Sequence, residues 1–196
     1  MAEGSGVLRG SSNHKVTLVT GNDGKRREVQ ACLEGHVLVE NVKLDLPEMQ
    51  SDSVFEISRN KALTAYGIIK SPVLVEDTAL CFDALGGLPG PYVKWFFERI
   101  GPTGLIKLLE GFDTRRAYAT CVFTYCAGPD VVLQFEGRCD GRIVEVPRGE
   151  GGFGWDCVFE PDEGCGQTYA EMQDEEKNRI SPRAKALVAL KARFCL

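Results

Sequence analysis

The sequence predicts an α/β fold, in which a twisted mixed sheet flanked by helices forms two lobes around a central cleft. Strand-like and helix-like segments alternate in the first half of the chain, and two long β-rich runs at 116–127 and 131–146 follow as an expected antiparallel pair. With 196 residues, 43% hydrophobic and 26% charged, the chain has the composition of one globular domain that buries a core. We expect this single two-lobed domain at 15–196, after a flexible tail at 1–14.

The first elements alternate between strand and helix. The β-branched run 16–20 stops at Gly-Asn, which predicts a strand followed by a turn. Residues 23–33 have helical spacing of apolar residues, and 37–42 form a second short β-branched run. The segment 44–50 contains a proline, so we expect a loop there.

A long helix is predicted at 54–69, and one lysine interrupts its apolar stripe. At steps of three and four residues the stripe reads Val54, Ile57, Lys61, Ala65 and Ile68. An amphipathic lysine in such a stripe normally packs its stem and extends its charged head to water. The alternative is a functional cation, which gains support because further acids and lysines gather at the ends of neighbouring elements.

The next strand, predicted at 73–81, carries two adjacent carboxylates, Glu76 and Asp77. Side chains alternate along a strand, so these two acids should lie on opposite faces. Burying an acid on each face costs several kcal/mol unless each has a partner. The pattern therefore favours a strand end that presents a carboxylate to a cation, or to a metal with phosphate.

The second half adds helices and a glycine-rich loop to the β-rich pair. Beyond the pair itself, we predict helices at 92–100, 103–109, 175–179 and 183–194, and a short strand at 158–160. Ser181 suits the N-cap of the last helix, with Pro182 at its first position.

Composition and charge exclude several classes of protein. The net charge of −5 argues against a nucleic-acid-binding surface. The sequence contains no run of about 20 apolar residues, so we expect no membrane-spanning helix. The first residues lack the apolar core of a signal peptide. The eight cysteines form no C-x-x-C pair, so we expect reduced, mostly buried thiols in a cytoplasmic protein rather than zinc ligands or a disulfide framework.

An anion site is one interpretation of the turn at 20–28, T-G-N-D-G-K-R-R-E. A helix N-terminus exposes N–H donors and a partial positive charge, and both favour a bound anion. The lysine and arginines in the first turns would be stabilised by such an anion. The alternative is a solvated basic helix face. The spacing matches neither a Walker loop nor a dinucleotide-binding fingerprint.

Two acids suggest a metal, namely Glu48 in L-P-E and Asp77 in V-E-D-T. One or two carboxylates completed by phosphate oxygens and water are the usual magnesium arrangement. The alternative is a pair of ordinary surface salt bridges.

A base site is one interpretation of F-G-W-D at 153–156, because aromatic rings beside glycines can stack on a nucleobase. The alternative is an aromatic plug that closes the core. Lys177 and Arg183 could donate hydrogen bonds to a carbonyl group of a ligand. Alternatively, Arg183 forms a salt bridge with Asp174 or Glu175.

Taken together, the motifs resemble the inosine triphosphate pyrophosphatase family from Val16 to Phe194. The resemblance rests on T-G-N-D-G-K-R-R-E, L-P-E, V-E-D-T, L-G-G-L-P-G-P-Y-V-K-W, F-G-W-D, Q-T-Y-A-E-M, E-K-N and S-P-R, in that order. It implies a homodimer with a central nucleotide cleft that hydrolyses noncanonical purine nucleoside triphosphates (ITP, dITP, XTP) to the monophosphate and pyrophosphate. It also implies dependence on Mg²⁺, with Mn²⁺ as a substitute.

The resemblance also assigns residues of the phosphate side. The triphosphate-binding turn corresponds to Thr20, Gly21, Asn22 and Lys25. Glu48 and Asp77 correspond to the magnesium ligands, and Lys61 to a lysine that contacts phosphate. Asp77, Glu48 and Lys25 are then the expected catalytic residues.

Further contacts with the nucleotide are implied for the remaining motifs. Thr78 and Lys94 correspond to nucleotide contacts, and the base pocket corresponds to Phe153, Gly154, Trp155, Asp156, Lys177, Ser181 and Arg183. The family commonly has S-H-R where this chain has Ser181-Pro182-Arg183, a departure that bears on base selectivity. Arg183 can donate to a 6-oxo group but cannot accept from a 6-amino group, which favours inosine over adenosine.

The implied reaction is attack of water at the α–β phosphate linkage, with pyrophosphate leaving. Mg²⁺ and three lysines, Lys25, Lys61 and Lys177, would neutralise the phosphates. Either Asp77, or Glu48 through the metal, would orient or deprotonate the water. The residues alone leave two rivals: a pyrophosphatase acting on pyrimidine or other modified triphosphates, and a nucleotide-binding module without turnover.

Overall fold

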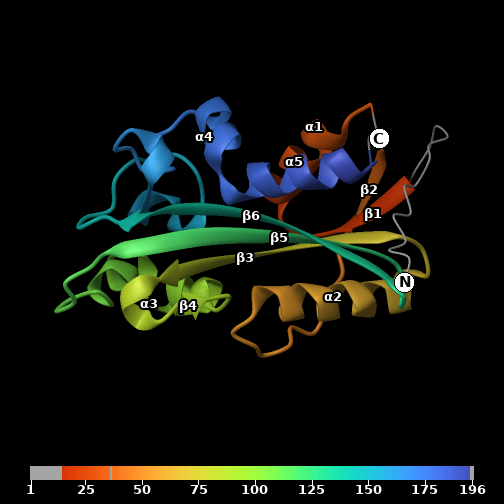
Figure 1. Ribbon diagram of the computed structural model, residues 1–196, viewed down its shortest axis with the longest axis horizontal. Coiled ribbons are helices and arrows are strands. Elements are labelled where there is room, and N and C mark those ends of the chain that lie inside the picture. Colours follow the sequence, from red (N-terminus) through yellow and green to blue (C-terminus); the bar gives the residue numbers. More distant parts are fainter. Residues whose placement is uncertain (1–14, 36, 195–196) are drawn as a thin grey trace, which may run out of the picture.

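The computed structural model describes residues 15–35 and 37–194, and its core is a seven-stranded sheet (Figure 1). The predicted tail at 1–14 lies outside the described residues. Six strands follow the order β2-β1-β3-β5-β6-β7, and the short β4 pairs with β3. The strands are β1 (Lys15–Val19), β2 (Leu38–Val42), β3 (Val73–Phe82), β4 (Pro89–Gly90), β5 (Arg116–Gly128), β6 (Val131–Ile143) and β7 (Phe159–Pro161).

The sheet is mixed, as predicted. β1 is parallel to β2 and β3, whereas β3, β5, β6 and β7 form an antiparallel series. The predicted pair of long β-rich runs is the β5–β6 hairpin, whose register shifts between Cys126 and Gly128. Figure 1 shows the two strands as long, twisted ribbons that run with β3 through the middle of the molecule.

Helices cover both faces of the sheet. They are α1 (Asp23–Leu33), α2 (Val54–Ile69), α3 (Val93–Lys107), α4 (Asp174–Ile180) and α5 (Pro182–Phe194), with short 3-10 turns η1 (Asp83–Leu85), η2 (Gly154–Val158) and η3 (Asp162–Gly164). Figure 1 places α1, α4 and α5 on one side of the sheet and α2 and α3 on the other. The predicted break near residue 101 is confirmed, because α3 contains a kink at Gly101, which has φ 65°, followed by Pro102.

Two departures from the sequence-based expectations concern α2 and β3. Ile68 is 58% exposed, although the stripe placed it on the buried face. The small residues Ser58, Ala62 and Ala65 face the sheet, and Ile68 in the last turn lies outside that contact. In addition, β3 continues to Phe82, so its two acids lie within the strand and not at its end.

The topology opens a crevice beside the middle of β3. β1 pairs with only the first residues of β3, through Thr17–Val73 and Leu18–Leu74, and β4 pairs with Leu80 and Cys81. Along this edge, 75–79 have no strand partner among the described residues. The chain leaves β1 toward β2 on one side and returns to β3 on the other, which is the switch point where α/β sheets bind ligands.

The structure also bears on the cysteines and on membrane insertion. Cys81, Cys121, Cys126 and Cys139 are buried thiols, whereas Cys157 is half-buried and Cys165 exposed. This agrees with the expectation of reduced, mostly buried cysteines; Cys195 lies outside the described residues. Within the described chain, no helix combines the length and apolar character that crossing a membrane requires.

Candidate active site

A cleft of about 920 Å³ opens at the switch point, and every predicted site residue lines it. These residues are Thr20, Gly21, Asn22, Lys25, Glu48, Lys61, Asp77, Thr78, Lys94, Phe153, Gly154, Trp155, Asp156, Lys177, Ser181 and Arg183. They come from all parts of the chain, so the fold brings together motifs that are far apart in sequence.

The turn between β1 and α1 forms one wall of the cleft. The Asn22 side chain caps α1 by accepting a hydrogen bond from the Lys25 backbone N–H at 3.1 Å, and the Asn22 N–H donates to Thr20 Oγ1 at 3.1 Å. Gly21 allows close approach of the Lys43 side chain, whose Cε would lie 3.2 Å from an added Cβ. The first backbone donors of α1 therefore lie at the cleft, where an anion is favoured.

Lys61 reaches from α2 into the cleft and binds two carboxylates. Its Nζ lies 2.5 Å from Asp77 Oδ1 and 3.0 Å from Glu48 Oε1. Burial alone would lower the pKa of Lys61, but the two acids outweigh burial and raise it. Likewise, burial would raise the pKa of Glu48, and Lys61 outweighs that effect and lowers it. Lys61 is therefore a largely buried cation that is paired with two acids, and not a lysine that extends to water.

The two carboxylates fit a magnesium site that phosphate completes. The Asp77 side chain is 13% exposed, and its buried Oδ2 has no hydrogen-bond partner among the described residues. Glu48 is 47% exposed at the cleft mouth. No cluster of three or more potential ligands occurs in the described chain, so water and phosphate would supply the remaining oxygens. The surface-salt-bridge alternative accounts for the exposed Glu48 but not for Asp77, which is half-buried.

Glu76 lies on the opposite face of β3, as the strand alternation predicted. Its side chain is 2% exposed, and its Oε2 lies 3.0 Å from Lys25 Nζ. Thr78 Oγ1 and Cys121 Sγ donate hydrogen bonds to its Oε1. Burial would raise the pKa of Glu76, but the charges of Arg183 and Lys25 hold it well below its ordinary value.

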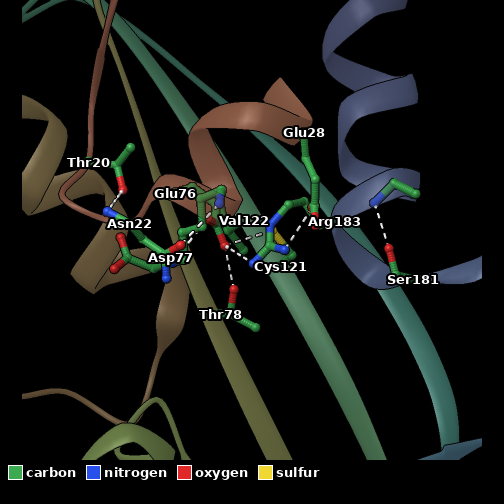
Figure 2. A network of polar contacts seen from close by, with 12 residues as sticks. Thr20, Asn22, Glu28, Glu76, Asp77, Thr78, Cys121, Val122, Ser181 and Arg183 are labelled. Atoms are coloured by element: carbon green, nitrogen blue, oxygen red, sulfur yellow. Dashed lines mark hydrogen bonds and ion pairs between the residues drawn. The ribbon is translucent and has the colours of Figure 1, made fainter. Parts of the chain in front are cut away.

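Arg183 lies at the start of α5 between two acids (Figure 2). Its Nη1 lies 2.8 Å from Glu28 Oε2, and its Nη2 lies 3.5 Å from Glu76 Oε1. The expected alternative partners in α4 were wrong, because the guanidinium points across to α1 and β3. Ser181 caps α5 as predicted, since its Oγ accepts a hydrogen bond from the Ala184 N–H at 3.2 Å, and α5 begins at Pro182.

The two aromatic residues of F-G-W-D fit different roles, one as a stacking platform for a base and the other as a plug that closes the core. Phe153 is 44% exposed in the cleft, as a stacking platform requires. Trp155 instead packs on the core, with ring centroids 5.8 Å from Phe159 and 6.3 Å from Tyr169. Phe153 therefore fits the platform and Trp155 fits the plug.

Lys177 and Asp156 fix the loop that carries Phe153. Lys177 Nζ lies 2.6 Å from Asp156 Oδ2 and 4.4 Å from the Phe153 ring centroid. The Phe153 N–H donates to the same Asp156 oxygen at 2.7 Å. Gly152, with φ 71°, leaves room for this carboxylate, because an added Cβ would lie 2.4 Å from Oδ2. Lys177 therefore lies beside the Phe153 ring, and its contacts are not with Glu48 or Asp77.

Sequence reasoning missed three residues around the cleft. Glu28 belongs to the quoted motif at 20–28 but received no role, and Glu76 was recognised only as an unusual acid. Lys43 also lines the cleft, but it lies between the second predicted strand and the predicted loop and received no role. Lys94, which was predicted, lies on the exposed side of α3, with its Nζ 5.1 Å from the Trp95 ring centroid.

Comparison with known proteins confirms the resemblance. Inosine triphosphate pyrophosphatase 2 of Trypanosoma cruzi is 97% identical over the whole of both chains. Inosine triphosphate pyrophosphatase of Fusarium vanettenii is 50% identical over 92% of this chain and 96% of its own. A HAM1 protein of Coxiella burnetii has a similar structure, with a TM-score of 0.83 and 26% identity over 91% of this chain and 97% of its own.

A further structural relative is the nucleoside-triphosphatase, or dITP/XTP pyrophosphatase, of Mycobacterium abscessus. It has a TM-score of 0.72 and 27% identity, and the match covers 90% of this chain and 98% of that one. The family model described as Ham1 family matches residues 16–193. The chain therefore belongs to the Ham1 family.

Proposed function

We propose that this protein hydrolyses noncanonical purine nucleoside triphosphates (ITP, dITP, XTP) to the nucleoside monophosphate and pyrophosphate. The observation that carries this proposal is a single cleft with two chemically different ends. The phosphate end consists of the turn 20–25 with Glu48, Lys61 and Asp77; the base end consists of Phe153, Lys177 and Arg183. The names of the relatives in Trypanosoma cruzi and Fusarium vanettenii support the same activity.

The phosphate end suits a triphosphate with a divalent cation. Glu48 and Asp77 would hold Mg²⁺, or Mn²⁺ in its place, which supplies charge neutralisation of the phosphate oxygens when bound. The α1 N-terminus, Lys25 and Lys61 supply further positive charge on the protein side. Lys177 was expected to share this role, but its contacts with Asp156 and Phe153 assign it to the base end.

Asp77 is the residue best placed to act on the attacking water. Its Oδ1 is held by Lys61, whereas its Oδ2 has no hydrogen-bond partner among the described residues and would accept the proton of the attacking water. Water would attack the α-phosphorus, the bond from that phosphorus to the bridging oxygen would break, and pyrophosphate would leave. Positioning and charge stabilisation dominate such transfers. Glu48 is more exposed than Asp77 and also binds Lys61, and we assign it to the metal rather than to the attacking water.

The base end accounts for the preference for 6-oxo purines over adenine. Phe153 offers a ring for stacking, and Lys177 and Arg183 offer only donors. A 6-oxo purine accepts such hydrogen bonds, whereas a 6-amino group leaves a donor unpaired, which costs about 1–3 kcal/mol. Pro182 occupies the first position of α5, where it preserves the helix start that carries Arg183.

We also propose a cytoplasmic homodimer. The unpaired thiols of Cys81, Cys121 and Cys126 are typical of a reducing compartment. Four large apolar side chains are exposed on and next to α3, namely Leu88, Trp95, Phe96 and Ile100. A second copy of the chain would cover these exposed side chains. Light scattering should give twice the monomer mass, and a monomer at micromolar concentration would contradict this.

The activity is tested by product analysis on a panel of ITP, XTP, ATP, GTP and dUTP, each with Mg²⁺ and with EDTA. The proposal predicts metal-dependent pyrophosphate from ITP and XTP and little from ATP or GTP. Rapid turnover of dUTP would favour the broader pyrophosphatase. Binding of ITP without any product would instead indicate a regulatory module.

A further inference from the structure

Glu76 is the most completely enclosed acid that lines the cleft. Four donors converge on its carboxylate: Thr78, Cys121 and Arg183, which are labelled in Figure 2, and Lys25. Its side chain is only 2% exposed, and Oε2, which has no hydrogen bond among the described residues, is held by its ion pair with Lys25. The carboxylate thus contacts cations and donors of the protein itself.

The donors come from different ends of the cleft. Lys25 lies on α1, next to the turn that we assign to phosphate, and Arg183 lies at the start of α5, next to Phe153. Glu76 is thus one negative charge between two cations that serve different parts of the same nucleotide. Glu28 binds only Arg183 of these two cations, at 2.8 Å, whereas Glu76 lies beside both Lys25 and Arg183.

We propose that Glu76 is a positioning residue that holds Lys25 and Arg183 in place and limits the affinity of the phosphate end for pyrophosphate. This inference rests on the proposed function. The fixed geometry follows from the buried, hydrogen-bonded carboxylate. The limit on affinity follows because a negative charge 3.0 Å from Lys25 Nζ offsets part of the attraction of that cation for phosphate.

Removal of the charge should therefore have two opposite effects. In Glu76→Gln, the two cations lose their shared anchor, and a displacement of about 1 Å can reduce turnover by about 10²-fold. At the same time, no neighbouring negative charge offsets the attraction of Lys25 for phosphate, so pyrophosphate should bind about fivefold more tightly. A merely structural residue would lower the active fraction without tightening the binding of a product.

The test uses the full chain with Glu76→Gln, Glu76→Asp and the control Glu160→Gln. Glu160 is likewise a buried acid paired with arginines, Arg142 and Arg148, but it does not line the cleft. Pyrophosphate affinity is measured by calorimetry in EDTA, and kcat and KM for ITP are measured with Mg²⁺. Calorimetry needs no turnover, so the inference and the proposed activity can fail separately.

We expect Glu76→Gln to lower kcat and to tighten pyrophosphate binding, whereas Glu160→Gln leaves pyrophosphate affinity unchanged. Glu76→Asp keeps the charge but has a shorter side chain, so it should lower kcat while its pyrophosphate affinity stays near that of the original protein. If Glu76→Gln does not fold, Glu76→Asp still tests the positioning role, and an unchanged kcat in that variant would overturn it. Unchanged kcat in both variants, or weaker pyrophosphate binding in Glu76→Gln, would overturn the proposal.

Discussion

The phosphate end and the base end of the cleft are built from different kinds of structure. Asp77 and Lys61 project from the interiors of a long strand and a long helix, both of which belong to the central scaffold. Phe153 and Lys177 lie on a glycine-rich loop and a short helix, and buried Asp156 ties them together. The comparison indicates that long, regular elements hold the groups that we propose for the reaction, whereas a loop and a short helix hold those that we propose for base recognition.

The largest effect is expected at the phosphate end. Asp77→Asn keeps the shape of the side chain but removes the proton acceptor and a negative charge. We predict a fall in kcat of about 10²–10⁴-fold, the usual contribution of a general base. The fall should be the same for ITP and XTP, because this residue lies away from the base. Pyrophosphate release would be measured, and activity within tenfold of the original protein would contradict the assignment.

A selective effect is expected at the base end. Arg183→Lys keeps a positive charge but loses the planar fork that spans Glu28 and Glu76. We predict a loss in kcat/KM for ITP of about tenfold to a hundredfold, which corresponds to the removal of one buried hydrogen bond. Discrimination against ATP should fall as well. An equal loss for ITP and ATP would place Arg183 outside base recognition.

Substitutions of the two aromatic residues of F-G-W-D should affect different properties, substrate affinity for Phe153 and stability for Trp155. Phe153→Ala removes an exposed ring, so KM for ITP should rise by about tenfold, in line with 1–3 kcal/mol of stacking. Trp155→Ala leaves a hole beside Phe159 and Tyr169 and should lower the free energy of unfolding by about 3–5 kcal/mol. Denaturant unfolding and initial rates distinguish the two, and the reverse pattern would exchange their roles.

The smallest effect concerns acid stability near the base end. Arg148, at the start of the glycine-rich loop, binds Glu160. Burial would raise the pKa of Glu160, but Arg142 and Arg148 outweigh burial and lower it from 4.5. A lowered carboxyl pKa stabilises the fold above about pH 4.5 and loses this contribution as the pH falls further. Glu160→Gln should thus flatten the decline in melting temperature below pH 4.5, and a parallel decline would contradict this.

The sequence predicted the phosphate end and the base end of the cleft to different degrees, because only the first lies on periodic elements. An acid on each face of β3 and a lysine in the stripe of α2 violate the ordinary pattern of buried elements, so the pattern itself pointed to Lys61 and Asp77. The same pattern misplaced Ile68, because periodicity does not say where a helix leaves its sheet. The residues themselves left the base end as one of two interpretations of F-G-W-D, and the resemblance favoured it, since glycine-rich loops carry no periodicity.

The pairing of charges was the part that sequence could not supply. Arg183 binds Glu28, which is 155 positions away, and not the nearby acids of α4. Such contacts depend on how α5 packs against α1 and β3, which only the assembled fold determines. For the same reason, the four donors on Glu76 could not be foreseen, although its burial could.

The central claim is that the two ends hold the nucleotide so that water attacks the α-phosphorus. Hydrolysis of ITP in water enriched with oxygen-18, followed by mass analysis of both products, tests this directly. We predict that the label enters inosine monophosphate and that pyrophosphate remains unlabelled. Label in pyrophosphate would place the attack on the β-phosphorus, and release of labelled orthophosphate would place it on the γ-phosphorus; either result would contradict the account.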